Sequence, residues 1–321
     1  MKIEMSYRWM KIQTHVHTIN SDGIHTLRDM AGAAKKRSID IIFLTDHNTM
    51  YGYKDIDNIS KETGVNIIKG IEYTTFYGHI ITIGAPYFRW ENLKEDSLNE
   101  LADHVHKHNG IIGIAHPMAI GDPVCTGGRY KFIDSDFGKI DFMEEWHGIA
   151  NNHNEWEKNE EFWKDKVEKG NRITTLYGGD FHRKEHFQQS DTFNWVFIDE
   201  SKDIEREVIN AISSGRVVMS KGPCFDMKIK KADRVYNMGN MVEIKENEKL
   251  NVIIDIDLNV ALENMILYLT DNCGEKVEID LNEKFIEICE KNDLKWIRVE
   301  ILHKTSRETL AKGNAIYFKH I

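Results

Sequence analysis

The chain has 321 residues, of which 41% are hydrophobic, which suffices for two domains with sizeable cores. Its 52 acidic and 42 basic residues give a formal net charge of −10, which argues against binding to bulk nucleic acid or to an anionic membrane. No apolar run approaches the roughly 20 residues of a membrane span, and the four cysteines are widely spaced without a Cys-x-x-Cys pair. No leader-like stretch opens the chain, so we expect a cytoplasmic protein with reduced thiols.

The first predicted strand contains a His-x-His pair. Apolar residues such as Ile12 and Val16 form the strand, and the run stops at the turn-forming residues 20–23. His15 and His17 are two residues apart, so in a strand both side chains point to one face, where they can reach one metal ion. Alone, the pair is weak evidence, because polar residues are common near the end of a strand.

From residue 17 to about residue 222, short apolar runs alternate with amphipathic stretches. The apolar runs predict further strands at residues 39–44, 65–69, 79–83, 110–115, 140–145, 173–178 and 195–198. The amphipathic stretches predict helices at residues 26–37, 54–62, 97–108, 155–169 and 204–213. This alternation is typical of an α/β fold with a mainly parallel sheet.

The pattern changes after residue 223, where apolar residues recur at every second position. A turn-rich segment at residues 271–274 separates two such runs and predicts a hairpin. We therefore expect a first domain of residues 1–222 and a small antiparallel β-sandwich of residues 223–321.

Most of the predicted strands in the first domain end in His, Asp or Glu. These residues are His15, His17, Asp46, His47, Glu72, His116, Glu144, Glu145, His147, Asp180 and His182, and His79 opens the strand at residues 79–83. In barrels, the carboxyl ends of the strands meet at one face, which carries the catalytic groups. A shared polar site explains this recurrence better than solvated strand ends do.

The chemistry of these residues indicates a metal site. Imidazole and carboxylate ligands without cysteine suit zinc, manganese or iron. The set is too large for one coordination shell, so we expect two or three divalent ions, with the two oxygens of Glu72 as a bridge.

Other residues are candidates for substrate contacts or for support. His79 is either a substrate contact or a neighbour of the ligands, and Asp46 is expected to support His47. Arg129, in the long loop 118–139, and Arg183, beside His182, are candidates for binding an anionic substrate, with solvated surface cations as the alternative.

The motifs together resemble those of the PHP (polymerase and histidinol phosphatase) metallohydrolases. They are Thr-His-Val-His at residues 14–17, Ser-Asp-Gly at 21–23, Thr-Asp-His-Asn at 45–48, Gly-Ile-Glu-Tyr-Thr at 70–74, Ala-His-Pro at 115–117 and Gly-Gly-Asp-Phe-His at 178–182. Within the family, Gly78-His79 and Gly215-Arg216-Val217-Val218 followed by Gly222-Pro223 are most similar to the carbaryl-hydrolase-like (CehA/McbA) branch. The resemblance implies a distorted (βα)7 TIM-like barrel for the first domain.

The resemblance also implies three sets of metal ligands. The first set is His15, His17, Glu72 and Asp180. The second set is Glu72, His116 and one residue of the segment 144–147, where we choose His147 over Glu144 and Glu145. The third set is Asp22, His47 and His182, although many relatives have His at the position of Asp22.

The function that follows is a metal-dependent hydrolase, in which metal-activated water attacks a small phosphoester. A carboxyl ester, carbamate or amide is the alternative substrate of the same site. The non-enzymatic alternative is a metal-stabilised scaffold or binding protein with a vestigial site. The sequence leaves open the substrate, the native metal, the general acid and the oligomeric state.

Overall fold

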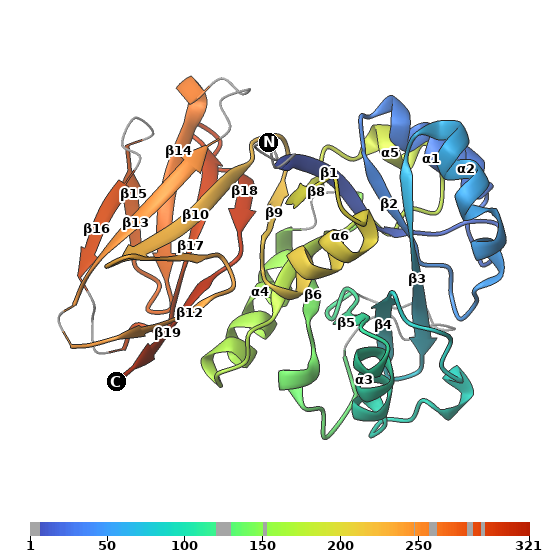
Figure 1. Ribbon diagram of the computed structural model, residues 1–321, viewed down its shortest axis with the longest axis horizontal. Helices are drawn as coiled ribbons and strands as arrows, with labels where there is room; N and C mark the ends of the chain where they lie inside the picture. Colours follow the sequence, from blue (N-terminus) through green and yellow to red (C-terminus); the bar gives the residue numbers. More distant parts are fainter. Residues whose placement is uncertain are drawn as a thin grey trace, which may run out of the picture. The chain divides into compact units, whose positions relative to one another are not determined.

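The computed structural model describes residues 7–119, 130–149, 153–246, 248–256, 262–280, 285–289 and 293–321. The chain forms two compact units, Met1–Ser213 and Ser214–Ile321 (Figure 1). None of the helices in these described ranges is long and apolar enough to cross a bilayer.

The first unit is built on a mixed sheet of eight strands, hydrogen-bonded in the order β8-β1-β2-β3-β4-β5-β6-β7. Their bounds are β1 Tyr7–Val16, β2 Ile41–Leu44, β3 Asn66–Thr75, β4 Gly78–Ile83, β5 Ile111–Ile114, β6 Phe142–His147, β7 Thr174–Gly178 and β8 Phe193–Asp199. The pairs β1–β2, β2–β3, β5–β6 and β6–β7 are parallel. The pairs that involve β4 or β8 are antiparallel, so the sheet is less uniformly parallel than predicted.

The direction of β4 follows from the connection before it. Only Phe76 and Tyr77 separate β3 from β4, and a connection this short permits a hairpin but no parallel crossover. As a result, Thr74 near the end of β3 lies opposite His79 near the start of β4. His79 therefore reaches the same edge of the sheet as the carboxyl ends of the parallel strands.

In the part of this unit that the structure describes, the α-helices are α1 Leu27–Lys36, α2 Ile56–Thr63, α3 Leu98–Lys107, α4 His153–Glu168, α5 His186–Gln189 and α6 Ile204–Ser213. Short 3₁₀ helices lie at Tyr51–Asp55, Trp90–Asn92 and Phe137–Lys139. The sequence predicted every α-helix except the four-residue α5, which is too short for a periodic pattern. α1 and α2 lie side by side, while α3, α4 and α6 pack against β5, β6 and β8 (Figure 1).

The start and the packing of α1 illustrate why the sequence folds in this way. Thr26 caps the helix by accepting a hydrogen bond from the backbone N–H of Asp29, whose carboxylate binds the backbone N–H of Thr26 in return. Leu27, Met30 and Ala34 recur at helical spacing and are buried in one hydrophobic cluster with Val16, Leu44 and Phe181. This cluster lies directly behind the strand ends that carry the candidate site.

No closed ring of strands is found in the described part of the first unit. The backbone at the end of β1 pairs with the segment after β7 through an isolated parallel bridge between Val16 and Phe181. Two hydrogen bonds flank this bridge, from His17 N–H to Phe181 O at 2.9 Å and from Phe181 N–H to His15 O at 3.1 Å. The predicted α/β fold is confirmed, whereas no closed sheet is found in the described residues, so the barrel stays a prediction.

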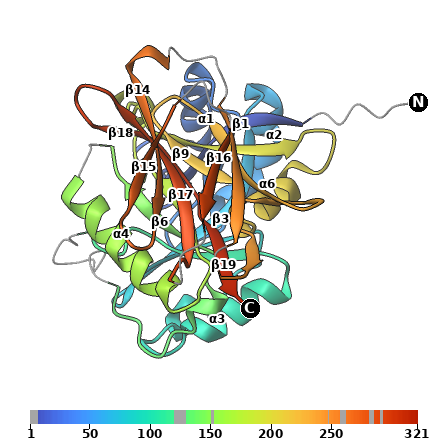
Figure 2. The ribbon, with the colours of Figure 1, turned by 90° about the vertical axis from the view of Figure 1, so that its left-hand side faces the viewer.

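The second unit contains two sheets, which Figure 2 views from another side. The strands are β9 Val217–Ser220, β10 Phe225–Lys231, β11 Arg234–Asn237, β12 Met241–Ile244, β13 Lys249–Ile256, β14 Met265–Asp271, β15 Lys276–Ile279, β16 Phe285–Cys289, β17 Trp296–His303, β18 Thr309–Gly313 and β19 Ile316–His320, with a 3₁₀ helix at Leu262–Asn264. One sheet has the order β12-β19-β17-β18-β9, with β14 paired to β17 and β15 paired to β14, and the other has the order β11-β10-β13-β16.

The two sheets of this unit meet through alternate side chains. Phe225, Met227 and Ile229 of β10 are all buried, and the Phe225 ring lies against Gly313 of β18, where an added Cβ would come within 2.8 Å of it. The turn after Asp271 joins β14 and β15 as the sequence predicted. The pairing is antiparallel throughout except between β12 and β19.

Candidate metal centre

One edge of the first unit's sheet gathers all nine predicted ligands. They lie on or just after β1 (His15, His17 and Asp22), β2 (His47), β3 (Glu72), β5 (His116), β6 (His147) and β7 (Asp180 and His182). The structure brings these side chains into overlapping groups, within each of which the candidate ligand atoms lie no more than 4.8 Å apart.

The first group consists of His15, His17, Glu72 and Asp180. The Nε2 atoms of the two histidines are 2.9 Å apart, and both lie 3.2–3.3 Å from Oε2 of Glu72. His17 Nε2 is also 3.0 Å from Oδ1 of Asp180. The side chains of His15, His17 and Glu72 are fully buried.

Unpartnered atoms in the first group show that it fits a cation. Glu72 Oε2 and Asp180 Oδ1 are buried, and neither has the geometry of a hydrogen bond within the described residues, although imidazole nitrogens lie close to both: His47 Nδ1 at 2.9 Å from Glu72 Oε2 and His17 Nε2 at 3.0 Å from Asp180 Oδ1. Leaving buried carboxylate oxygens unpaired is costly unless a cation satisfies them. The two facing Nε2 atoms and the two oxygens form a donor set that suits a transition-metal ion.

The second oxygen of Glu72 faces another group. Its Oε1 lies 2.9 Å from His79 Nδ1 and 3.1 Å from His116 Nε2. His116 also forms a group with His147 and Asp180, and His147 Nε2 is 3.4 Å from Asp180 Oδ2. Glu72 and Asp180 each direct one oxygen toward the first group and one toward the second.

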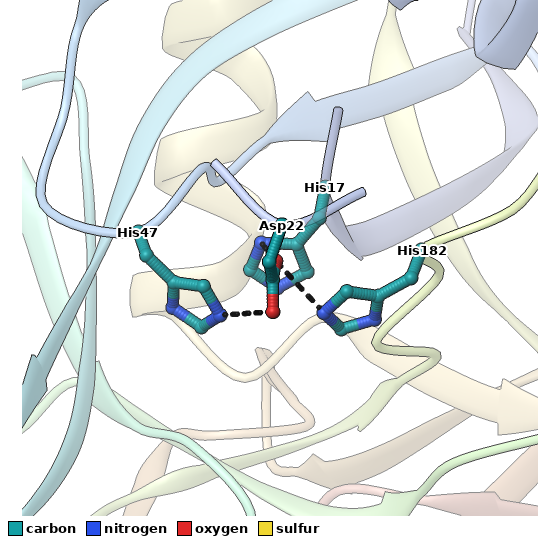
Figure 3. A group of neighbouring side chains, drawn as sticks. All are labelled: His17, Asp22, His47 and His182. Atoms are coloured by element: carbon teal, nitrogen blue, oxygen red, sulfur yellow. Dashed lines mark ion pairs between the residues drawn. The ribbon is translucent and has the colours of Figure 1, made fainter. Parts of the chain in front are cut away.

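The third group surrounds the carboxylate of Asp22 (Figure 3). Its Oδ1 lies 3.1 Å from His182 Nε2, and its Oδ2 lies 3.4 Å from His47 Nε2. The structure adds His17 to the predicted set, with its Nδ1 3.9 Å from Asp22 Oδ1. The Asp22 side of this group faces solvent, because the side chain of Asp22 is 56% exposed. The opposite side is closed, because the side chain of His17 is fully buried.

Electrostatics in the cluster favour bound positive charge. Burial opposes ionisation of Glu72, but the neighbouring His15, His79 and His116 outweigh it and hold the pKa of this carboxyl well below its usual value. Burial likewise opposes protonation of His47, yet Asp22 and Glu72 raise the pKa of His47 to about 10. The negative field that stabilises a proton on this imidazole also attracts divalent cations.

Two of the candidate ligands have unusual backbone conformations. The φ angles of His116 and Asp180 are 25° and 53°, in the left-handed region that residues other than glycine seldom adopt. Strain of this kind persists where the surrounding structure holds the residue in place, and it is concentrated at functional sites.

Comparison with known proteins identifies the family. The PHP domain matches residues 13–264, which is more than half of the chain. The chain belongs to the PHP domain family. Its finer placement in the carbaryl-hydrolase-like branch stays a prediction.

Two relatives of this PHP protein match different lengths of its chain. An uncharacterized protein of Methanocaldococcus jannaschii is 28% identical over 156 residues, which cover 44% of this chain and 88% of that protein. A 5'-3' exoribonuclease of Haemophilus influenzae is 29% identical over 65 residues, which cover 20% of this chain and only 24% of the exoribonuclease.

A solved structure resembles both units. It is a two-domain protein from Bacteroides vulgatus that contains a predicted PHP-like metal-dependent phosphoesterase, and the match covers 97% of this chain and 96% of that one. The TM-score is 0.54 at 14% sequence identity, so the likeness concerns the fold.

The three alternatives that the sequence left open in β6 of this PHP domain have different surroundings. His147 forms a potential ligand group with His116 and Asp180, and Glu144 forms one with His15 and His116. One oxygen of Glu144, however, lies 2.8 Å from His15 Nδ1, on the far side of that ring from Nε2, and the other accepts the backbone N–H of His116. Glu145 is buried and belongs to none of the potential ligand groups of the described chain. The geometry therefore favours His147 as the ligand from this segment.

The predicted substrate contacts have different surroundings. His79 is only 6% exposed and contacts Glu72, so it lies inside the ligand cluster. Arg183 is exposed and forms no ion pair with any residue that the structure describes. Arg129 lies outside the described residues.

Sequence reasoning missed two partners of the ligands. Glu155 of α4 accepts a hydrogen bond from His147 Nδ1 at 2.9 Å, and the hydroxyl of Thr74 contacts His47 Nδ1. Such partners fix the orientation of a ligating imidazole. Thr74 stands in the Gly-Ile-Glu-Tyr-Thr motif and could have been suspected, whereas Glu155 lies in a charged helix with nothing to distinguish it.

Proposed function

We propose that this PHP protein is a metal-dependent hydrolase that cleaves a small phosphoester. The observation that carries the proposal is the buried carboxylate of Glu72. Its Oε2 has no hydrogen-bond partner in the described residues, and its two oxygens face two different histidine groups. This arrangement suits a carboxylate that bridges two cations.

Three sets of residues would hold the ions. His15, His17, Glu72 and Asp180 would hold the first ion, and Asp22, His47 and His182 would hold the third. Glu72, His116 and His147 would hold the second; here the structure groups Glu72 with His79 and His116, and His147 with His116 and Asp180. When bound, divalent ions at such a site polarise a phosphoryl oxygen and make water a stronger nucleophile.

The protein's own residues then position these groups and the substrate. His79 contacts Oε1 of Glu72 and so helps to fix the orientation of the bridging carboxylate. The exposed side of the cluster, with Asp22, His47 and His182, is open to substrate. Arg183 follows His182 directly, and we propose that its guanidinium, together with that of Arg129, binds the anionic substrate.

The experiment that tests this proposal is Glu72→Gln. The amide keeps the size of the side chain but can accept hydrogen bonds or bind a cation through one oxygen only. We expect the metal content and the hydrolysis of phosphoesters to fall together. Unchanged turnover in a metal-free Glu72→Gln protein would refute the mechanism.

Glu205→Gln is the matched control for this substitution. Glu205 is a partly buried residue of α6, and its Oε1 lies near Gly84. Gly84 directly follows β4, whose other end carries His79. The control removes a carboxylate from the same unit without touching the ligand cluster, so its metal content and turnover should match those of the unaltered protein.

A further inference from the structure

The carboxylate of Glu144 lies beneath the metal ligands and is fully buried. Its Oε1 lies 2.8 Å from His15 Nδ1, and its Oε2 accepts a hydrogen bond from the backbone N–H of His116 at 3.0 Å. Both oxygens are thus occupied by protein donors. The two donors belong to residues from different strands, β1 and the end of β5.

The contact with His15 has a chemical consequence for the first group. An imidazole that donates its Nδ1 proton to a carboxylate leaves the lone pair of Nε2 available. Nε2 of His15 is the atom that faces Glu72 Oε2, at 3.2 Å, and Asp180 Oδ1, at 3.3 Å. Glu144 therefore selects the tautomer in which His15 can bind a cation on that side.

The contact with His116 acts on the backbone. His116 has a φ of 25°, which costs conformational energy unless neighbouring groups hold it. A charge-assisted hydrogen bond from its own N–H to Glu144 is such a restraint. The same carboxylate thus fixes one residue of the first group and one residue of the second.

Gly178 leaves the space that this carboxylate occupies. A Cβ atom at this position would lie 1.9 Å from Oε1 of Glu144 and 2.0 Å from its Cδ. Any side chain at residue 178 would therefore displace the carboxylate. This close approach explains the first glycine of the Gly-Gly-Asp-Phe-His motif, which ends β7 two residues before Asp180.

We propose that Glu144 is a positioning residue that sets the tautomer of His15 and the backbone of His116, and that it does not bind metal itself. The inference rests on the proposed metal-dependent function. It assigns a role to a residue that the sequence offered only as an alternative ligand.

The test is Glu144→Gln, compared with the unaltered protein by zinc titration against a chelator. A glutamine side chain accepts through one oxygen, so it cannot receive both the His15 and the His116 bonds. We expect the full number of zinc ions at saturation, but an affinity lower by about 10- to 100-fold for the most affected ion. The visible absorption of the cobalt-substituted protein should shift as well, because the field around His15 changes.

Two further variants make the result interpretable. Gly178→Ala, which displaces the same carboxylate, should change affinity and spectrum in the same direction, and it serves where Glu144→Gln fails to fold. Asp199→Asn is the matched control. Asp199 is also a buried carboxylate, and it accepts a hydrogen bond from the backbone N–H of Ser201. It lies opposite Tyr7, at the start of β1, whereas the ligands lie at the other end of that strand. Its zinc affinity should equal that of the unaltered protein.

The outcomes separate this inference from the proposed function. Loss of one whole zinc equivalent at saturation in Glu144→Gln would make Glu144 a ligand, and unchanged affinity and spectrum would deny it any role at the site. Either result overturns the inference while the metal-dependent function stands. Failure of the unaltered protein to bind zinc or cobalt would overturn the proposed function, and the positioning role with it.

Discussion

The carboxylate of Asp46 accepts hydrogen bonds from both the backbone N–H and the hydroxyl of Thr18, at 2.6 and 2.7 Å. It also accepts the hydroxyl of Ser21 at 2.8 Å. Asp46 is buried and immediately precedes His47, while Thr18 and Ser21 belong to the loop that carries Asp22. One carboxylate thus ties together two of the predicted ligands of the third group.

Asp46→Asn should loosen this loop. An amide accepts through one oxygen, so at least one of the three bonds is lost and a buried polar group is left unpaired, at a cost of about 1–3 kcal/mol. We expect a lower melting temperature and weaker metal binding by the third group, with the first group unaffected. Calorimetric metal titration and thermal unfolding measure both effects.

Asp40→Asn is the control. Asp40 lies just before the start of β2, away from His47, and it accepts a hydrogen bond from the backbone N–H of Lys11 at 2.8 Å. This variant should lose stability without losing metal. Equal metal affinities in Asp46→Asn and the unaltered protein would contradict the anchoring role of Asp46.

Metal removal should proceed in two stages. The ligands of the first group include three fully buried side chains, whereas the side chains of Asp22, His47 and His182 are 56%, 21% and 26% exposed. A chelator should therefore remove the third ion before the others, and Asp22→Asn should abolish this early phase alone. Release of all ions in one phase would show that the sites are not ranked by exposure.

The pH dependence of stability should contain a contribution from His106. The hydrogen bond to Asp141, at 2.9 Å, raises the pKa of His106 above its usual value. A histidine with a raised pKa stabilises the folded state fully below the unfolded pKa of about 6.5, and this stabilisation is lost as the pH rises through the folded pKa. Because the imidazole is 37% exposed, solvent screens the pair, and we expect only about 0.5 kcal/mol.

Urea unfolding of His106→Gln at pH 5.5 and pH 9 measures this contribution. The variant should be less stable than the unaltered protein at pH 5.5 and nearly equal to it at pH 9. His108→Gln, on the same helix end, removes an imidazole that binds a backbone carbonyl, that of His104, and serves as the control. A deficit in His106→Gln that is the same at both pH values would refute the electrostatic origin.

Arg183→Ala should weaken binding of anionic substrates. Loss of a charge-assisted contact raises KM for a phosphoester on the order of tenfold while kcat changes little. Lys184→Ala is the matched control, because Lys184 is the neighbouring exposed cation. Identical KM values in Arg183→Ala and Lys184→Ala would remove Arg183 from the proposed substrate site.

Much of the candidate site could be predicted from sequence because its residues stand in short local motifs at strand ends. His15 and His17 illustrate this, since the two-residue period of a strand brings both rings to one face. α1 was equally readable, because its cap and its apolar spacing are local features. The antiparallel direction of β4 was harder to predict, although the two-residue connection at Phe76 and Tyr77 requires it.

The remaining features depend on contacts between distant segments. The contact between Glu144 and His15 joins residues 129 positions apart, and no pattern in β6 distinguishes this carboxylate from Glu145. The sequence predicts that Asp46 supports the adjacent His47, but it does not indicate that the carboxylate also binds the loop 18–21. Closure of the sheet likewise depends on twist and register along eight strands, which periodicity does not encode.

The most direct test of the central claim is elemental analysis of the purified protein combined with hydrolysis of p-nitrophenyl phosphate, bis-p-nitrophenyl phosphate and p-nitrophenyl acetate. We predict about two or three equivalents of a divalent transition metal, with turnover of a phosphate ester that chelation abolishes and added metal restores. Turnover of the acetate alone would transfer the activity to carboxyl esters. Negligible metal and no turnover after reconstitution would contradict the hydrolase assignment and favour a scaffold with a vestigial site.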